Sequence, residues 1–299
     1  MAYGSFRELA QAAAQLGSLG AAAVAREAED TLVTETAVLT RMEETLLVME
    51  TAIAHGLAGD LPPRARLVGG DARRVAENAP RLSGDGLTTA IARALATGEV
   101  NASMGRVAAA PTGGASGVLP AVLTMIAERV GASRERTVLA LAAAAGVGGV
   151  IAARATLAGS AGGCQAEIGS AAAMAAAAAT ELAGGTVEQA GHAASFALQG
   201  QLGLVCDPVG GLVEVPCVVR NATGTAVALA AVELALAGAA FQIPLDEVID
   251  AMGSVGRSLP PSLRETARGG LAATPTGHRL TSNAAAGRGD GQPADPSSA

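Results

Sequence analysis

The sequence predicts an all-α protein, a single large helical domain rich in alanine and glycine, with irregular loops that carry its cysteines. Half of the 299 residues are hydrophobic, yet only four are aromatic, so small aliphatic side chains must fill the core. Alanine is the best intrinsic helix former. The 39 glycines supply helix ends and points of close backbone contact.

The N-terminal helices are predicted within residues 1–60. Apolar residues recur at intervals of three and four along residues 5–57, which predicts helix in at least two pieces. A break is expected near Gly17–Gly20, and Gly56 caps the last piece. Prolines 62 and 63 and glycines 69 and 70 then mark a connection, after which a helix begins at Ser83 or Asp85 and ends near residue 97.

The cysteine-bearing core is predicted over residues 61–281, which completes a domain spanning 1–281. Residues 99–120 are rich in Gly, Ser, Thr and Asn and predict a loop. Helices are expected at about 120–130, 135–146, 148–157, 166–183, 186–199, 222–240 and 244–255, with the hairpin "CDPVGGLVEVPC" between the fifth and sixth. The polar tail, residues 282–299, is expected to be disordered.

The charge of the chain limits its partners. The formal net charge is −7 and all 20 basic residues are arginine. No basic stripe is present, so neither nucleic acid nor an anionic membrane surface is an expected partner. A pyridoxal-phosphate enzyme needs a lysine for its Schiff base, and this sequence contains none. That cofactor is therefore excluded.

The most apolar window, residues 137–153, is a buried helix-turn-helix in our interpretation. It is mostly Ala and Gly and is flanked by arginines, whereas a membrane span needs about 20 more strongly apolar residues. The N-terminus lacks the basic-then-apolar pattern of a signal peptide. We therefore expect a cytoplasmic protein, with reduced thiols and no membrane partner.

The three cysteines are Cys164, Cys206 and Cys217. Their spacing matches neither zinc ribbons nor ferredoxin runs, and an isolated cysteine is commonly an inert buried side chain. Each, however, lies within two residues of Gly or Pro at an expected turn, where backbone N–H groups can stabilise a thiolate. Three thiolates would leave one iron of a [4Fe–4S] cluster open, and an open iron is a Lewis acid for a substrate oxygen.

The loop before residue 120 is a second candidate site. Small donors and a following helix start are typical of a site for a carboxylate or a phosphate. The loop lacks the Walker A signature, so it is not a P-loop. A polar connection between helices is the alternative.

Seven stretches, in order over roughly residues 67–277, resemble one family. They are "EVNASMG", "AAPTGGASGVLP", "AGGCQAEIGSAAAMAAAA", "ELAGGT", "LGLVCDPVGGLVEVPCVVRNATG", "IPLDEVIDAM" and "LPPSLRETARGGLAATPTG". The chain resembles the alpha subunit, or catalytic domain, of iron–sulfur-dependent L-serine dehydratases. "GCQAE" followed by "GLVCDPVxGLVEVPC" is highly specific. A departure from the family is Ala115, where members commonly have serine.

The resemblance implies a function and a partner. It implies an all-helical lyase that converts L-serine to pyruvate and ammonia, with one [4Fe–4S] cluster per chain on Cys164, Cys206 and Cys217. It also implies a beta subunit, which carries a small α/β domain that this sequence does not contain, and an oligomeric assembly.

Other residues are assigned to this expected site. We expect the substrate hydroxyl on the open iron and the substrate carboxylate on donors of the loop. His192 matches a family histidine and is the candidate base, although it also fits a core histidine. Glu167 and Arg220 are a candidate acceptor and counter-charge beside the cysteines. The expected substrate-binding residues are Asn101, Ser103, Thr112, Gly113, Ser116 and Gly117.

Two alternatives to serine dehydration stay open. One is a non-enzymatic helical scaffold that binds a metal. The other is the same cluster chemistry on another small hydroxy acid, of which threonine is the obvious case.

Overall fold

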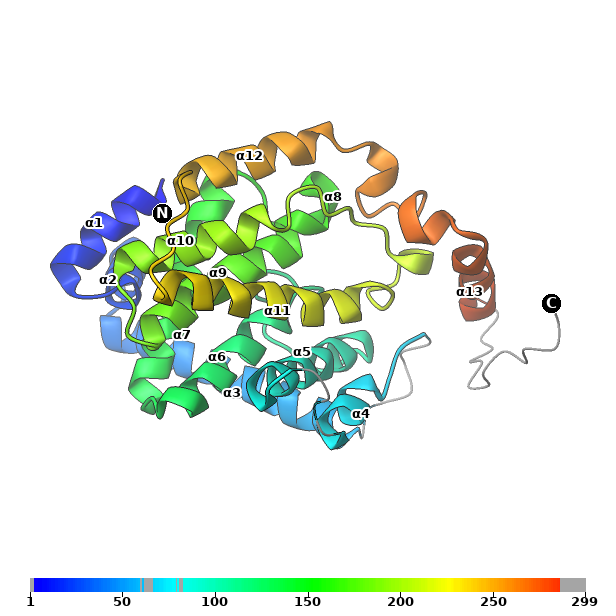
Figure 1. Ribbon diagram of the computed structural model, residues 1–299, viewed down its shortest axis with the longest axis horizontal. Helices are drawn as coiled ribbons and strands as arrows, with labels where there is room; N and C mark the ends of the chain where they lie inside the picture. The colour runs from blue at the N-terminus through cyan, green and yellow to red at the C-terminus, as the bar shows by residue number, and fades with distance from the viewer. Residues whose placement is uncertain (1–2, 60, 62–66, 79, 81–82, 286–299) are drawn as a thin grey trace.

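The computed structural model describes residues 3–59, 61, 67–78, 80 and 83–285, and this part of the chain is a bundle of α-helices without a β-strand (Figure 1). The all-α prediction is confirmed. The α-helices are α1 (Phe6–Leu16), α2 (Leu19–Thr31), α3 (Glu35–Ala58), α4 (Asp71–Glu77), α5 (Asp85–Ala102), α6 (Val118–Val130), α7 (Arg134–Arg154), α8 (Gly159–Gly162), α9 (Ser170–Leu182), α10 (Val187–Gln199), α11 (Cys217–Leu236), α12 (Leu245–Ser258) and α13 (Pro275–Ala285). The short helices are η1 (Gln165–Gly169, a π-helix), η2 (Val209–Gly211), η3 (Pro261–Leu263) and η4 (Gly270–Ala273).

Helix α9 is the centre of the bundle and contacts α6, α7, α10 and α11 (Figure 1). Its run of alanines from Ala171 to Ala179, interrupted only by Met174, is buried along its whole length. Alanine side chains let the surrounding helices approach closely on every side, which is how a chain with few aromatic residues fills its core.

The N-terminal region contains one more helix break than the sequence predicts. The break at Gly17 and Ser18 is confirmed, but the chain breaks again at Leu32, which has a left-handed backbone (φ 55°). The Thr34 side chain then accepts a hydrogen bond from the N–H of Ala37 and starts α3. The prediction missed this break because Leu is not a residue that signals one.

Helix α7 corrects the prediction of two shorter helices at 135–146 and 148–157. Its glycines lie inside one continuous helix, because they face neighbours rather than a turn. A Cβ atom at Gly148 would come within 3.0 Å of the Met174 side chain, and one at Gly146 within 3.1 Å of Ala23. Glycine here serves close helix packing, which the sequence alone does not distinguish from a turn.

Two other boundaries also differ from the prediction. Helix α5 continues to Ala102 rather than ending near residue 97, so part of the expected loop is helical. The buried Glu99 carboxylate accepts hydrogen bonds from the N–H groups of Gly70, Asp71 and Ala72 and caps α4. Helix α11 begins at Cys217 itself rather than at residue 222.

The C-terminal helix α13 extends past the predicted start of the tail. It continues to Ala285, and the hydroxyls of Thr281 and Ser282 donate to carbonyls four residues earlier. Ala284 is buried, so the predicted boundary at Ser282 is four residues too early. Residues 286–299 of the predicted tail lie outside the described residues, as do Pro62 and Pro63 of the expected connection.

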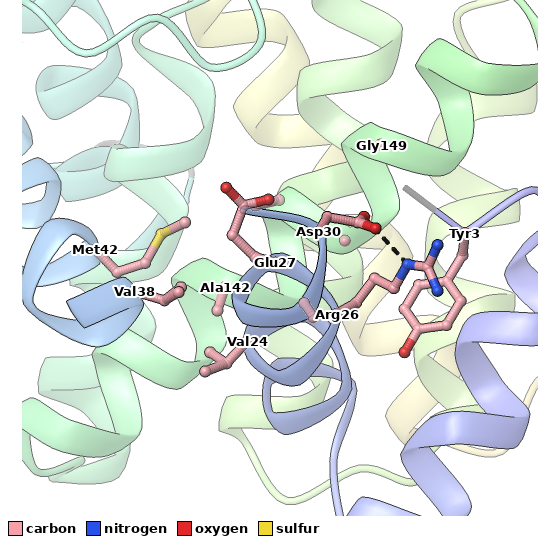
Figure 2. A pocket seen from close by; sticks show the side chains of 12 residues that line it. Tyr3, Val24, Arg26, Glu27, Asp30, Val38, Met42, Ala142 and Gly149 are labelled. Atoms are coloured by element: carbon pink, nitrogen blue, oxygen red, sulfur yellow. Dashed lines mark hydrogen bonds and ion pairs between the residues drawn. The ribbon is translucent and has the colours of Figure 1, made fainter. Parts of the chain in front are cut away.

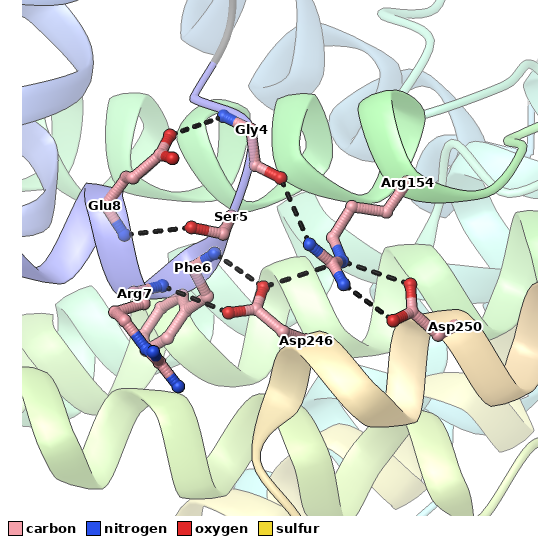
Figure 3. Close-up of polar contacts among 8 residues, drawn as sticks. All are labelled: Gly4, Ser5, Phe6, Arg7, Glu8, Arg154, Asp246 and Asp250. Atoms are coloured by element: carbon pink, nitrogen blue, oxygen red, sulfur yellow. Dashed lines mark hydrogen bonds and ion pairs between the residues drawn. The ribbon is translucent and has the colours of Figure 1, made fainter.

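A polar cluster ties the beginning of α1 to α12 (Figure 3). The Asp246 carboxylate accepts hydrogen bonds from the N–H groups of Phe6 and Arg7. Arg154, at the end of α7, pairs with Asp250 over 2.6 Å and donates to the Gly4 carbonyl. This cluster holds one end of α12, and the other end of α12 reaches the cysteines.

Two helices, α7 and α11, are long and apolar enough by length and composition to cross a membrane. In α7, 61% of the apolar window is buried inside the protein, and α11 packs against α5, α9 and α10. Both serve as packed helices of the bundle.

Candidate active site

The three cysteines come from three separate segments of the chain. Cys164 lies between α8 and η1, Cys206 lies in the extended segment after α10, and Cys217 is the first residue of α11. All three are free thiols; Cys164 and Cys206 are buried, and Cys217 is half-buried. Cys206 lies in the loop between α10 and η2. Cys164 directly precedes η1, and Cys217 begins α11.

The thiols lie close enough to alter one another's ionisation. The interaction between the neighbouring thiols of Cys164 and Cys206 lowers the pKa of Cys164 and raises that of Cys206. Burial, with a contribution from the charge of Cys164, raises the pKa of Cys217 to about 12. The guanidinium of Arg220 beside Cys164 also lowers its pKa. Of the three, Cys164 therefore carries negative charge most readily.

Glu167 brings a carboxylate to the thiols. Its Oε2 atom lies 3.9 Å from the sulfur of Cys206. Its Oε1 atom accepts a hydrogen bond from the Thr112 hydroxyl over 2.6 Å. Burial raises the pKa of Glu167, against the opposing effect of the bond from Thr112. Sequence reasoning assigned Glu167 as an acceptor near the cysteines but did not pair it with Thr112.

The glycine-rich loop places free donors beside Glu167. Among the described residues, no acceptor binds the N–H groups of Gly113 and Gly114, which are both partly accessible. A Cβ atom at Gly114 would lie 3.3 Å from Val213 and 3.7 Å from Glu167 Oε1. The loop therefore approaches the cysteine hairpin with its backbone, and helix α6 begins four residues later.

Other predicted loop residues hold the loop in place. Ser116 is fully buried and its hydroxyl donates to the Gly113 carbonyl, so a ligand would reach it only if the loop opened. The N–H of Gly117 donates to Asn221 Oδ1. Asn221 Nδ2 donates in turn to the carbonyls of Gly114 and Cys217. Asn221, which sequence reasoning missed as a bridge, thus joins the loop to a cysteine.

Asn101 and Ser103 lie at the end of α5. Asn101 Oδ1 lies 3.1 Å from the position that a Cβ atom of Gly113 would occupy, so Asn101 borders the loop. Ser103 is the C-cap of α5 and is buried. Asn101 thus adjoins Gly113 of the loop, whereas Ser103 serves as a buried helix end.

Arg220 and Asp207 form a buried ion pair behind the thiols. Arg220 Nη2 lies 2.8 Å from Asp207 Oδ1, and Nη1 donates to the Val205 carbonyl. The geometry at Oδ1 is that of an ion pair rather than of a hydrogen bond, because this atom makes no hydrogen bond with the described residues. Asp207 Oδ2 accepts from the N–H of Leu271, which fixes the C-terminal segment here.

The segment from Leu263 to Glu265 pairs with Cys206 through the backbone. The N–H of Cys206 donates to the Leu263 carbonyl, and the N–H of Glu265 donates to the Cys206 carbonyl. Arg264, between them, has a buried Nε atom without a hydrogen-bond partner among the described residues. Sequence reasoning missed this pairing, because no local pattern joins residues some 60 positions apart.

His192 has structural contacts away from the thiols. Its Nδ1 atom accepts a hydrogen bond from the N–H of Phe241, and its Nε2 atom lies 3.9 Å from Glu188 on the same helix. None of these partners belongs to the loop or to the cysteine segments. These contacts are those of a histidine that fixes the connection between α11 and α12.

A separate cavity of about 170 Å³ lies among α2, α3 and α7 (Figure 2). Val24, Val38, Met42 and Ala142 line it, and Arg26 lies over the ring of Tyr3 at its edge. It contains none of the predicted site residues. Its lining is mostly apolar, with the charged side chains of Arg26, Glu27 and Asp30 on one side.

Cys164, Cys206 and Cys217 are sulfur donors of the kind that would hold an iron–sulfur cluster. Among residues 3–285 as far as they are described, no three His, Cys, Asp or Glu side chains close around one metal ion. A cubane cluster needs its thiolates wider apart, roughly 6–7 Å. Three grouped thiols, the cation of Arg220 and the orphaned Arg264 Nε atom supply sulfur ligands and positive charge for such an anionic group.

The fold and the site together define an all-helical protein with three thiols that affect one another's ionisation, one of them joined through Glu167 to a glycine-rich loop. Residues 11–272 match the family model of the serine dehydratase alpha chain. The chain belongs to this family.

Several relatives of known name are similar over most of the chain. "Probable L-serine dehydratase, alpha chain" of Bacillus subtilis (strain 168) is 48% identical over 260 residues, which cover 86% of each protein. "L-serine dehydratase, alpha chain" of Peptoniphilus asaccharolyticus is 44% identical over 257 residues, 85% of this chain and 88% of the relative. "L-serine dehydratase" of Streptomyces coelicolor (strain ATCC BAA-471 / A3(2) / M145) is 40% identical over 235 residues, 75% of this chain and 51% of the relative.

Proposed function

We propose that this chain is the catalytic alpha chain of an L-serine ammonia-lyase, which converts L-serine to pyruvate and ammonia. One observation carries the proposal: the three thiols converge with Glu167 and Thr112 next to the unpaired N–H groups of Gly113 and Gly114. The family match and the names of the relatives point to the same substrate.

Cys164, Cys206 and Cys217 would hold one [4Fe–4S] cluster per chain. When bound, this group would supply a Lewis acid that assists loss of the substrate hydroxyl, which is otherwise a poor leaving group. Deprotonation of buried thiols is costly, and the positive charge of Arg220 beside Cys164 reduces that cost.

The loop would bind the carboxylate of L-serine. The N–H groups of Gly113 and Gly114 lack acceptors among the described residues and lie close to the start of α6, where the helix dipole favours an anion. The Thr112 hydroxyl has a single proton, which it donates to Glu167. Glu167 thus orients that hydroxyl at the edge of the carboxylate site and extends the polar wall towards Cys206.

Among the described residues no histidine contacts the loop, and the Glu167 carboxylate there already accepts the Thr112 hydroxyl proton in a hydrogen bond. A base acts from within about 3 Å of the proton that it takes. His192 contacts Phe241 and Glu188, so we assign it a structural role. We propose that a beta subunit in an oligomeric, cytoplasmic enzyme supplies the base and excludes water from the bound serine.

The test is anaerobic reconstitution of the full chain with iron and sulfide, followed by metal analysis, visible spectroscopy and a pyruvate assay with and without a beta chain. We expect close to four irons per chain, the broad visible absorption of an iron–sulfur cluster, and pyruvate release that needs the beta chain. The variants Cys164→Ser, Cys206→Ser and Cys217→Ser should each lose the cluster while keeping the helical signal.

Each negative result has a distinct meaning. A chain that binds the cluster but releases no ammonia from L-serine with any beta chain would be a metal-binding scaffold. Faster turnover of L-threonine than of L-serine would show that the proposed substrate is wrong and that the proposed cluster chemistry is right. A wild-type chain that binds no iron would contradict the cluster proposal.

A further inference from the structure

Gln165 follows Cys164 directly and is fully buried. All of its side-chain hydrogen bonds are to backbone groups. Its Nε2 atom donates to the Gly162 carbonyl over 2.8 Å and to the Met252 carbonyl over 3.2 Å. Its Oε1 atom accepts from the N–H of Gly203 over 2.9 Å. One amide therefore satisfies three backbone groups from three different segments.

These segments are the ones that place two of the cysteines. Gly162 belongs to the turn before Cys164, and Gly203 lies three residues before Cys206. The backbone N–H of Gln165 also donates to the Leu204 carbonyl over 3.0 Å. Two hydrogen bonds thus join Gln165 to the chain segment that leads to Cys206, and a third joins it to the turn that leads to Cys164.

Close backbone contacts make these hydrogen bonds hard to replace with water. A Cβ atom at Gly256 of α12 would lie 2.8 Å from the Gly162 Cα atom and 3.3 Å from Gln165 Nε2. A Cβ atom at Gly163 (φ 77°) would lie 2.9 Å from the Leu204 carbonyl oxygen. Three backbones therefore meet around one side chain, and a buried polar group left without a partner there is costly.

The helix type at this point is unusual. Gln165 begins η1, a π-helix, and π-helical turns occur mostly as single turns at functional sites. The π-turn lies between Cys164 and α9, and it also carries Glu167. The amide of Gln165 holds the beginning of this turn against α12.

We propose that Gln165 is a positioning residue that fixes Cys164 relative to Cys206 through the backbone segments that carry them. The reason for fixing the two cysteines rests on the proposed function, because a preformed cluster site requires thiolates at a fixed separation. The geometric claim is independent of the cluster, because it concerns the two thiols of the metal-free chain.

The first test therefore uses the metal-free full chain. Gln165→Met keeps the length of the side chain and removes every side-chain hydrogen bond, and Gln165→Glu keeps only the side-chain acceptor for the N–H of Gly203. Each thiol is labelled with iodoacetamide, and the rate of alkylation of each cysteine is measured by mass spectrometry of the peptides. We expect both variants to react several-fold faster at Cys164 and Cys206, with little change at Cys217, which Gln165 does not contact.

Cys217 serves as an internal control, and Gln189→Met is the matched variant. Gln189 also bonds two backbone groups, the Ala235 carbonyl and the N–H of Thr186, but lies away from the cysteines. The Gln189→Met variant should leave the alkylation rates of all three cysteines unchanged. Unaltered rates at Cys164 and Cys206 in the Gln165 variants would overturn the proposal. Equal acceleration at all three cysteines would also overturn it, because that pattern marks loss of the whole fold.

The second test uses the reconstituted chain and measures release of iron to a chelator without oxygen. Loss of residues that hold metal ligands in place commonly weakens binding by about 10–100-fold. We expect Gln165→Met to release iron faster by a factor in that range and Gln189→Met to match the wild type. If the wild-type chain binds no cluster, the proposed function fails, while the thiol labelling still decides the role of Gln165.

Discussion

Thr112 Oγ1 donates a hydrogen bond to Glu167 Oε1 over 2.6 Å, across 55 positions of sequence. This contact joins the glycine-rich loop to the π-turn that follows Cys164. It joins the glycine-rich loop to the cysteines, because Glu167 also lies 3.9 Å from the Cys206 sulfur. The loop and the cysteines should therefore respond together to substitution.

Thr112→Val should raise the KM for L-serine by roughly tenfold, because it removes the hydrogen bond of about 1.5–3 kcal/mol to Glu167 that holds the edge of the carboxylate site in place. Thr112→Ser keeps the hydroxyl and should stay near the wild type. Steady-state pyruvate release by the alpha and beta chains together measures both. Thr180→Val is the control, because the Thr180 side chain is fully buried and its hydroxyl donates to the Ala176 carbonyl inside α9, away from the loop. Normal kinetics in Thr112→Val would contradict a role of Thr112 in substrate binding.

Arg220→Met should destabilise the chain by about 3–5 kcal/mol, because it leaves the buried Asp207 carboxylate without its partner. Urea unfolding of the metal-free chain gives this value. The double variant Arg220→Met with Asp207→Asn should recover part of the loss, since neither charge then stays unpaired. Additive losses in the double variant would show that the two residues act independently.

Glu99→Gln should destabilise the chain by about 1–3 kcal/mol, because an amide cannot accept all three N–H groups that the carboxylate accepts at the start of α4. Hydrogen exchange should show faster exchange at the amides of Asp71 and Ala72. Glu188→Gln is the control, since the Glu188 side chain is 86% exposed. Unchanged exchange at α4 in Glu99→Gln would contradict the capping role.

Glu181 should make stability depend on pH. Its carboxylate accepts hydrogen bonds from the N–H groups of Leu19 and Gly20, and burial raises its pKa above the ordinary value of 4.5. A carboxyl with a raised pKa in the folded state binds more protons than in the unfolded state. Its contribution to stability is therefore complete below pH 4.5 and is lost as the pH rises through the folded-state pKa.

The measurement is the free energy of unfolding of the wild type and of Glu181→Gln over a series of pH values. The stability of the wild type relative to the variant should fall as the pH rises from 4.5. A difference that rises with pH would mean that the folded state favours the charged form, against the effect of burial.

His192→Asn should leave turnover close to that of the wild type. A general base contributes about 10²–10⁴-fold to the rate, and the contacts of His192 with Phe241 and Glu188 are structural. Asparagine keeps an acceptor for the N–H of Phe241. A loss of turnover by a factor of 100 or more, on the scale of a general base, with unchanged unfolding would restore His192 as the catalytic base.

The sequence determined the helical class and the elements with a clear local signal. The break at Gly17, the Thr186 capping box of α10 and the alanine-rich α9 each depend on residues a few positions apart. It misjudged glycines that face another helix, because a glycine needed for close contact looks the same in sequence as a glycine in a turn. Gly146 and Gly148 inside α7 are the clearest cases.

The sequence also identified the three cysteines and the loop from Thr112 to Gly117 as the parts of one candidate site, since their motifs are local. Only the tertiary structure decided which side chains connect them. Thr112 meets Glu167, Asn221 joins Gly114 to Cys217, and Gln165 joins the turn before Cys164 to the approach to Cys206. These contacts span tens of positions and depend on how helices pack. Short-range propensity fixes each segment of this chain, whereas burial and backbone hydrogen bonding between distant segments fix the site.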